Sequence, residues 1–593
     1  MKGQAPRPAD DVVVLDESPK KGFSELFKSE DYWAIWLGAV VLLMGLFLYV
    51  VLGPVTDARQ KIDEYNAVMA AEAQRAPFKT MAWHQAREAK EKVTTRSEPA
   101  KILEQYLARP GRWDTSPAAS FYLSPEEAKA VSEANKPKFE AAQKEREEAE
   151  AKAKIAEADA AAAGYKDAAL NAQAGSQIDA WIKAREAEAK AKKAAETKPY
   201  NHFVSLGVLC VALGLFFSIG MKIMGASLRR FLLGFPFVFL LAALAYFLAA
   251  QVDIRAWGLE YVLWAIIIGL LISNTVGTPK WVMPAVQTEY YIKTGLILLG
   301  ASILFGKIIL VGLPGLLITW VACPAVLIFT YWFGQRILKM ESKTLNIVLS
   351  ADMSVSGVSA AIATAAACRA KKEELTLAIG ISIIFTSLMM FVMPAVAKAV
   401  GMHPVLAGAW MGGSIDSTGA VVAAGALLGN EAMTVAATIK MIQNILIGIV
   451  AFGVAAYWTT VVDRTRAGEV ELTAGAAVRE IWKRFPRFIL GFLGASLVFS
   501  AIYQYLGPDM GKAVLDEGMI RGWSSILQGW FFALAFVSIG LGTNFRELKK
   551  YLKGGKPVIL YIVGQSAQWI ITLVMAYLLF FVLFRSITDR LMM

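Results

Sequence analysis

Two short stretches of this sequence place hydroxyl groups, glycine and a carboxylate in otherwise apolar surroundings. The first reads DMSVSGVSAA from position 352, and its chemically useful members are Asp352, Ser354, Ser356, Gly357 and Ser359. Glycine allows the backbone to open, and a helix that starts there carries about half a positive charge at its N-terminus. Hydroxyls and free N–H groups directed at one small volume would bind an anion or a carboxylate. The alternative is that serine and alanine serve only close helix packing.

The second stretch reads GGSIDSTGAVVAAG from position 412. It supplies Ser414, Asp416, Ser417, Thr418 and Gly419. We take the hydroxyls and glycines of both stretches as substrate-binding candidates. An aspartate inside a membrane segment costs at least about 2.5 kcal/mol, so we expect Asp416 to face a cavity or a partner.

The candidate partner of Asp416 is Lys440, in the apolar run 432–460, with Asn444 nearby. An acid and an amine at membrane depth can titrate or exchange a cation, which predicts coupling to protons or sodium. Asp352 is a further ion-coupling candidate, although its position nearer the inner face would allow water to reach it. The alternative is a static buried ion pair that holds the segment in place.

The composition of the chain is that of a polytopic membrane protein. Hydrophobic residues make up 56% of its 593 positions, and the mean hydropathy is +0.47. Stretches of about 20 mostly apolar residues, enough to cross a bilayer, recur from Tyr32 to Phe584. The net charge of +11 comes from Lys and Arg mainly in short loops, where they set orientation. We therefore expect the lipid bilayer, and no nucleic acid, as a partner.

One basic cluster argues that both chemical stretches are re-entrant. If 345–368 crossed the membrane, Arg369, Lys371 and Lys372 would lie outside, against the positive-inside rule. A hairpin at 345–368 entered from inside returns the cluster to the cytoplasm, and 404–429 becomes a second hairpin entered from outside. Each arm would be about 15 Å long, so the tips would meet near the midplane. Two crossing, unwound helices are the alternative geometry.

The charge rule also divides the chain into four parts. Residues 1–31 form a cytoplasmic tail, 32–53 a transmembrane anchor, 54–200 a periplasmic helical domain and 201–593 the membrane domain of a transporter. The protein would then lie in the inner membrane as a multi-pass protein with its N-terminus in the cytoplasm.

The insert, residues 54–200, is rich in Ala, Glu and Lys and predicts long soluble helices. Ser124 is expected to cap one of them, with breaks at Gly164 and Gly175. The large side chains that could pin these helices together are Trp83, Trp113, Tyr122 and Trp181. The insert is either a docking arm for a periplasmic partner or a solvated spacer.

A weak internal repeat accompanies this layout. Leu299-Gly300, with Phe305 following, resembles Ile539-Gly540 with Phe545, and the two spans would run in opposite directions. Shared membrane composition is the other explanation of the match. We predict an all-α polytopic membrane protein with inverted-repeat transporter architecture, two re-entrant hairpins or broken helices, and an extramembrane helical insert.

At these residues the sequence resembles the sulfate exporter family of transporters, also described as conserved hypothetical membrane proteins, over about residues 205–580. The family's first motif, T-S-I-C-G-x-S-A, falls on 353–360 and keeps Ser354, Gly357, Ser359 and Ala360. Its second motif, S-I-H-D-T-A-Q-V-V-A-A, falls on 414–424, where its His, Asp and Gln are replaced by Asp416, Ser417 and Ala420. A following K-x-x-R pattern has Gln443 in place of its Arg.

The resemblance implies a fold related to sodium–proton antiporters and bile-acid symporters. Because the departures lie inside the supposed site, fold and transport carry over better than sulfate does. We predict a secondary active transporter of a small anion, sulfate or another small sulfur-containing or carboxylate anion, that moves the hairpin core against an outer scaffold in an elevator-like manner. We expect a homodimer, no metal site, and no cofactor beyond sodium as a candidate coupling ion.

Two alternative functions remain at this level. One is a cation/proton antiporter, favoured by the two aspartates, and the other is a membrane scaffold or assembly protein that uses the insert. An enzyme is not expected, because His84, His202 and His403 have no spacing that makes a metal site or a nucleophile relay.

Overall fold

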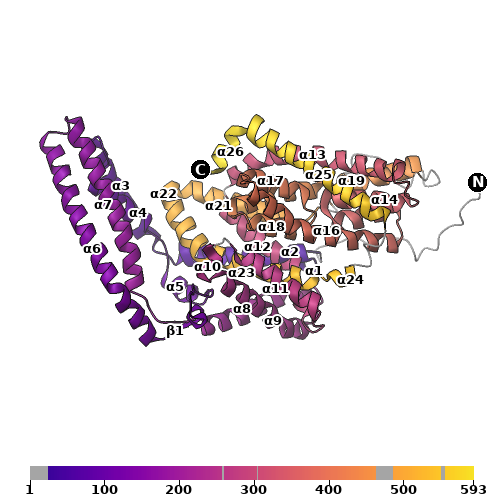
Figure 1. Ribbon diagram of the computed structural model, residues 1–593, viewed down its shortest axis with the longest axis horizontal. Coiled ribbons are helices and arrows are strands. Elements are labelled where there is room, and N and C mark those ends of the chain that lie inside the picture. Colours follow the sequence, from indigo (N-terminus) through magenta and orange to yellow (C-terminus); the bar gives the residue numbers. More distant parts are fainter. Residues whose placement is uncertain are drawn as a thin grey trace, which may run out of the picture.

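The computed structural model describes residues 25–256, 259–303, 305–462, 478, 482, 485–548 and 555–592; most of the predicted tail, residues 1–24, lies outside this part. The described residues include nine helices long and apolar enough to cross a membrane. Figure 1 shows membrane helices side by side along the long axis, with the insert projecting from one end. The prediction of an all-α polytopic membrane protein is confirmed.

One group of membrane helices, the scaffold, packs around α12 and α23. Its elements are α1 (Glu25–Lys28), α2 (Glu30–Leu46) with the π-turn Phe47–Val51, α8 (His202–Ile223), α9 (Leu228–Ala249), α10 (Val252–Ala256), α11 (Tyr261–Thr275), η4 (Met283–Ala285), α12 (Thr288–Ser302), α21 (Phe488–Leu506), α22 (Pro508–Gly511), the π-helix Lys512–Ser524, α23 (Ser525–Gly542) and α24 (Phe545–Leu548). Close packing needs glycine: a Cβ on Gly540 would lie 2.5 Å from the Ile266 carbonyl oxygen.

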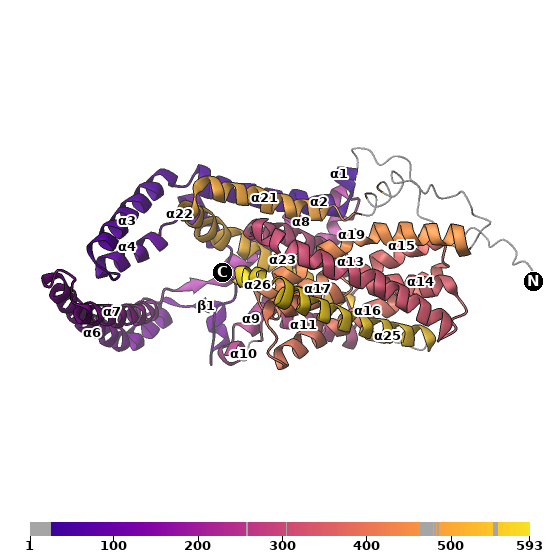
Figure 2. The same ribbon diagram turned by 90° about the horizontal axis from the view of Figure 1, so that it is seen from above.

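The second group, the core, packs around α19. Its elements are α13 (Phe305–Arg336), α14 (Lys343–Ala351), the π-turn Asp352–Ser356, α15 (Val358–Cys368), α16 (Lys372–Ala399), α17 (Pro404–Ser414), α18 (Thr418–Ala426), α19 (Asn430–Tyr457) with the π-turn Trp458–Val462, α25 (Lys556–Tyr577) with the π-turn Leu578–Leu583, and α26 (Arg585–Met592). Figures 1 and 2 show α13, α16, α19 and α25 together on one side of the membrane domain.

Both stretches that were predicted to be re-entrant fold into hairpins of two short helices. In the first, Glu374 at the start of α16 accepts hydrogen bonds from Ser342 Oγ (2.5 Å) and Thr344 Oγ1 (2.8 Å) at the start of α14, so α15 returns to the face that α14 left. In the second, Gly408 and Gly425 both lie against the first turn of α19. The two hairpins enter from opposite faces because α16, a full span of 28 residues, connects them.

The insert folds into two helix pairs, α3 (Val55–Arg75) with α4 (Met81–Glu91) and α6 (Pro125–Ala162) with α7 (Ala168–Ala195) (Figure 2). Between the pairs lie α5 (Glu98–Glu104), η3 (Pro117–Ser120) and β1 (Tyr122–Leu123), which pairs antiparallel with β2 (Tyr200–Asn201).

Local sequence signals set the ends of these helices. Ser124 caps α6 as predicted, because Ser124 Oγ accepts from the Glu127 N–H and Glu127 accepts from the Ser124 N–H. Gly164, with a φ of +60°, makes the turn between α6 and α7. The predicted break at Gly175 is wrong: this residue lies inside α7, where an isolated glycine is tolerated. Trp181 is buried against Met81 and does pin the pairs together.

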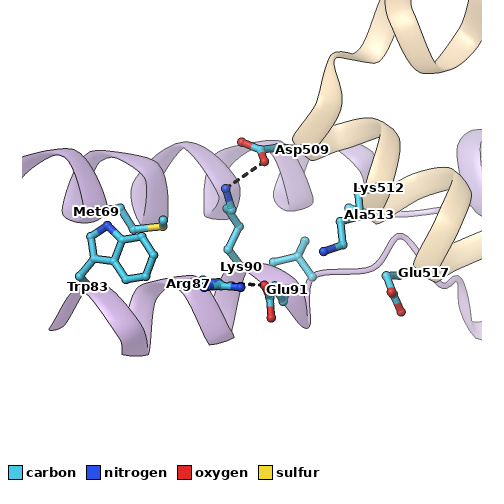
Figure 3. Close-up of a pocket in the computed structure, with 10 residues that line it drawn as sticks. Met69, Trp83, Arg87, Lys90, Glu91, Asp509, Lys512, Ala513 and Glu517 are labelled. Carbon is cyan, nitrogen blue, oxygen red and sulfur yellow. Dashed lines mark hydrogen bonds and ion pairs between the residues drawn. The ribbon is translucent and has the colours of Figure 1, made fainter. Parts of the chain in front are cut away.

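The insert is fastened to the scaffold. Lys90 Nζ forms an ion pair with Asp509 of α22 at 2.9 Å (Figure 3). The Asn66 amide donates to the same carboxylate. Residues 93–123, which we call the docking strap, follow the end of the membrane domain. There the Trp113 ring stacks on Phe247 of α9 at 4.8 Å and its indole N–H donates to the Phe247 carbonyl. We call this end of the membrane domain the insert face.

Cysteine labelling tests the hairpin geometry. With Cys210, Cys323 and Cys368 replaced by alanine, single cysteines at the exposed positions Glu341 and Lys371 should react with a membrane-impermeant maleimide from one side of the membrane. A cysteine at the exposed Glu431 should react from the other side. Labelling of positions 341 and 371 from opposite sides would instead mean that α14 and α15 cross the membrane.

Candidate functional site

The two re-entrant tips meet in the middle of the core. In the first tip, α14 ends at Ala351, a π-helical turn follows, and Gly357 takes a φ of +55° before α15 begins. This backbone conformation favours glycine. A Cβ on Gly357 would also lie 3.1 Å from Cβ of Asp416 in the second tip, so the missing side chain lets the tips touch.

The second tip opens in a similar way. After α17 ends at Ser414, Ile415 is extended and Ser417 becomes the N-cap of α18, where its hydroxyl accepts from the Ala420 N–H at 3.1 Å. The first N–H groups of a helix have no partner inside that helix. Both α15 and α18 therefore begin, with the positive ends of their dipoles, where the tips meet.

Side-chain amides satisfy the carbonyl groups that the breaks release. Gln443 Nε2 on α19 donates to the carbonyl of Ser354 in the first tip at 3.3 Å and to that of Gly413 in the second at 3.2 Å. Gln568 on α25 donates to the Gly413 carbonyl at 2.6 Å. Gln443 thus ties both tips to α19, and Gln568 ties the second tip to α25 as well.

Lys440 and Asn444 of α19 add further hydrogen bonds to the tips. Asn444 accepts from the Ser356 hydroxyl at 2.7 Å and donates to Thr418 Oγ1 at 3.1 Å. Lys440, which is fully buried, donates to the Val355 carbonyl at 3.1 Å. Asn444 therefore bridges the two hairpins, whereas Lys440 binds only the first.

Two carboxylates meet at one tyrosine. Tyr561 Oη of α25 lies 2.9 Å from Asp352 Oδ2 and 2.7 Å from Asp416 Oδ2, and all three side chains are buried. A hydroxyl has a single hydrogen to donate to these two oxygens. Either that hydrogen is shared between the two oxygens, or one carboxyl group carries a proton and donates to the tyrosine oxygen. A proton on either aspartate would relieve the repulsion between the two like charges.

Two predicted details are wrong. Asp352 was expected to be hydrated, but it is 0% exposed because α25 covers it. Lys440 was expected to pair with Asp416; the two groups interact electrostatically, but among the described residues no direct ion pair joins the Lys440 ammonium group to a carboxylate. It donates instead to a tip carbonyl and to Gln443 at 2.7 Å, while Tyr561 is the partner of Asp416.

A cavity of about 980 Å³ opens beside the tips, between core and scaffold, on the face opposite the insert. Six predicted site residues line it: Ser356, Gly357, Ser359, Ser417, Thr418 and Asn444. The other six, Asp352, Ser354, Ser414, Asp416, Gly419 and Lys440, are not among its lining residues. The tips therefore divide the predicted set into a group that contacts the cavity and a buried group.

The outer part of this cavity is charged. Lys293 of α12 pairs with Glu30 at 2.6 Å and Asp31 at 2.9 Å at the start of α2, and lies 3.9 Å from Glu289. The backbone N–H of Arg487 donates to Asp31 at 2.7 Å. The cluster connects the scaffold helices α12, α2 and α21 at the wall of the cavity.

Sequence reasoning missed the contribution of α25. Tyr561, Gln565, Gln568 and Thr572 recur at intervals of four, three and four residues, which places them on one face of an otherwise apolar helix. This polar stripe was visible in the sequence. Gln565 also donates to the Ser414 carbonyl at 2.8 Å, so the whole stripe faces the tips.

Fold and site together define a polytopic α-helical membrane protein in which two re-entrant hairpins meet beside a cavity. A family model described as "Conserved hypothetical protein 698" matches residues 233–561, from α9 to Tyr561. The chain belongs to this family. The tip motifs predicted membership of a family of conserved membrane proteins, and this prediction is confirmed. The names of the relatives assign no cargo.

Individual relatives agree with this assignment. A UPF0324 membrane protein from Nitratidesulfovibrio vulgaris (strain Hildenborough) is 55% identical over 581 residues, covering 98% of this chain and 99% of the relative, so the match extends into the insert. Another, from Rhodopirellula baltica, is 57% identical over 381 residues, or 64% of this chain and 68% of the relative. No solved structure matches the chain.

The bridging hydroxyl gives a stability prediction. Tyr561→Phe should lower the free energy of unfolding by about 1–3 kcal/mol, because it leaves buried carboxyl oxygens without their hydrogen bond. Denaturation of the purified protein in detergent measures the change. Tyr577→Phe is the matched control, since this tyrosine lies on the same helix but is 52% exposed. Equal losses in both variants would show that the Tyr561 bridge contributes no stability.

Proposed function

We propose that this protein is a secondary active transporter of a small anion. The observation that carries the proposal is the start of two helices, α15 and α18, at tips that touch each other and line one cavity of about 980 Å³. Irregular backbone at membrane depth is tolerated only where it is buried in protein or lines a cavity. Here it does both, as in transporters that bind their substrates between broken helices.

The chemistry of the tips suits an anion with oxygen acceptors. Two helix N-termini, each with about half a positive charge, face the same volume. Hydroxyls of Ser359, Ser417 and Thr418 stand at the first turns of these helices. Sulfate, other small sulfur-containing anions and small carboxylates all present acceptor oxygens to such donors, and they form the proposed cargo class.

Behind the tips, a proton on the aspartate pair would supply a means of coupling. If one proton resides on the pair Asp352 and Asp416, its release or uptake changes the charge directly beneath the anion seat. Sodium is the other candidate. Asp352 Oδ1, Ser354 Oγ and Ser414 Oγ are buried oxygens without a hydrogen-bond partner in the described chain, and oxygen ligands suit hard cations.

Sidedness follows from the positive-inside rule, which supports a periplasmic insert and a cytoplasmic opening of the large cavity. The structure would then correspond to an inward-facing state. Movement of the core past the scaffold would present the tips to the other side, and the division of the membrane domain into two packing groups supports such an elevator-like motion.

A cation/proton antiporter is the second candidate, favoured by the buried pair of aspartates beside Lys440. Its expected signature is sodium-dependent proton movement in vesicles that contain no sulfur or carboxylate anion. Asp416→Asn should abolish that movement, because the side chain can no longer exchange a proton.

Reconstitution tests the leading proposal. In proteoliposomes, a Ser359→Ala/Thr418→Val double variant should lower the initial rate of anion transport at least about tenfold, since it removes two hydroxyls from the seat and a hydrogen bond to a charged group contributes about 1.5–3 kcal/mol. Ser387→Ala is the control, because Ser387 lines the same cavity but donates to the Ile383 carbonyl of its own helix. Sulfate, sulfite, a small sulfonate and acetate are tested with and without a pH or sodium gradient.

The proposal fails if the wild-type protein moves none of these anions under any gradient. It also fails if the double variant and the Ser387 control transport the accepted anion equally well.

A further inference from the structure

A second cavity, of about 740 Å³, lies on the insert face, again between scaffold and core. Its walls come from α11, α12 and α23 of the scaffold and from α13, α17 and α19 of the core. The insert contributes a single lining residue, Arg109 of the docking strap. A side chain of the insert thus reaches the space between the scaffold and the core. These are the two groups of helices that would move past each other in the proposed transport cycle.

The position of Arg109 is set by specific contacts with the scaffold. Its Nη2 donates to the carbonyls of Ser525 at 3.3 Å and Ile526 at 3.1 Å, and the guanidinium lies over the Tyr246 ring at 5.1 Å. A Cβ on Gly529 would lie 2.3 Å from Nη2. A side chain at this position would displace the guanidinium from its present place against α23.

Arg109 reaches the cavity without a direct ion pair among the described residues. Glu260 and Glu431 line the same cavity, but within the described chain no carboxylate forms an ion pair with Arg109. Its Nε–H is buried and has no acceptor there. A partly buried guanidinium without a counter-ion is unfavourable, and its planar fork of N–H donors matches carboxylate and sulfate oxygens.

We propose that Arg109 is an anion-binding residue of the insert-face cavity, which holds an oxyanion of the carboxylate, sulfonate or sulfate class on its path to or from the tips. This inference rests on the proposed anion transport and adds a second, sided site to it. It also gives the insert a role in permeation: the strap carries a recognition residue into the membrane domain, and the α6–α7 pair is not needed for that contact.

Sided kinetics and direct binding test the assignment. With radiolabelled sulfate as the first probe, and methanesulfonate and acetate as competitors, Arg109→Gln should raise the half-saturating concentration about tenfold or more for anion supplied from the insert face. The value for anion supplied from the opposite face should stay unchanged. The physical reason is the loss of one charge-assisted contact, and a tenfold change in affinity corresponds to about 1.4 kcal/mol.

Arg96→Gln is the matched control. Arg96 belongs to the same strap and pairs with Glu104 at 3.1 Å, but it lines neither cavity. It should therefore loosen the strap without altering sulfate affinity. If both arginine variants lose thermal stability and insert-face affinity together, Arg109 only anchors the strap and the assignment is wrong.

Equilibrium binding separates this inference from the proposed function. In the Ser359→Ala/Thr418→Val background, which weakens the tip seat, residual sulfate binding should disappear on adding Arg109→Gln and persist on adding Arg96→Gln. Arg109-dependent binding in a protein that transports nothing would keep the site and overturn only the proposed function. The proposed site would be overturned if Arg109→Gln left transport from both faces unchanged. It would also be overturned if the wild-type protein showed no Arg109-dependent binding of any of the three anions.

Discussion

The structure depends on how backbone groups freed by two helix breaks find partners at membrane depth. Lipid offers no hydrogen bonds, so each opened carbonyl must be satisfied by the protein itself. Gln443 does this for both tips at once, and Gln568 adds a bond to the second. The polar faces of α19 and α25 are therefore required by the breaks, and these two helices fix where the tips meet.

In the proposed transporter, the same arrangement would separate the anion seat from the pair of aspartates. On the cavity side, the tips present hydroxyls and helix N-termini, whereas Asp352, Asp416 and Tyr561 are buried and connected by hydrogen bonds. Gly357, which lines the cavity, lies against Asp416, since a Cβ on Gly357 would be 3.1 Å from Cβ of Asp416. A change of charge on the aspartate pair would therefore act on an anion through low-dielectric surroundings, where electrostatic interactions are strong.

The membrane domain has one cavity at each face, between the scaffold and the core. At the contacts described, the insert is attached only to the scaffold. Lys90 forms an ion pair with α22, and Trp113 and Arg109 donate hydrogen bonds to α9 and α23. In an elevator-like cycle these contacts would stay fixed while the core moves past them, which suits a strap that presents a fixed recognition residue.

The sequence by itself determined the membrane class, both hairpins and most of the tip residues, because apolar run length, the position of Arg369 and its neighbours, and clustered serine and glycine are local signals. It did not determine which polar and charged side chains contact each other. Lys440 and Asp416 looked like partners on charge alone, yet α25 inserts Tyr561 beside Asp416 and leaves Lys440 to a backbone carbonyl. Such pairings, like the contact of Arg109 with a helix more than 400 positions away, arise only when distant segments pack, so tertiary structure decided them.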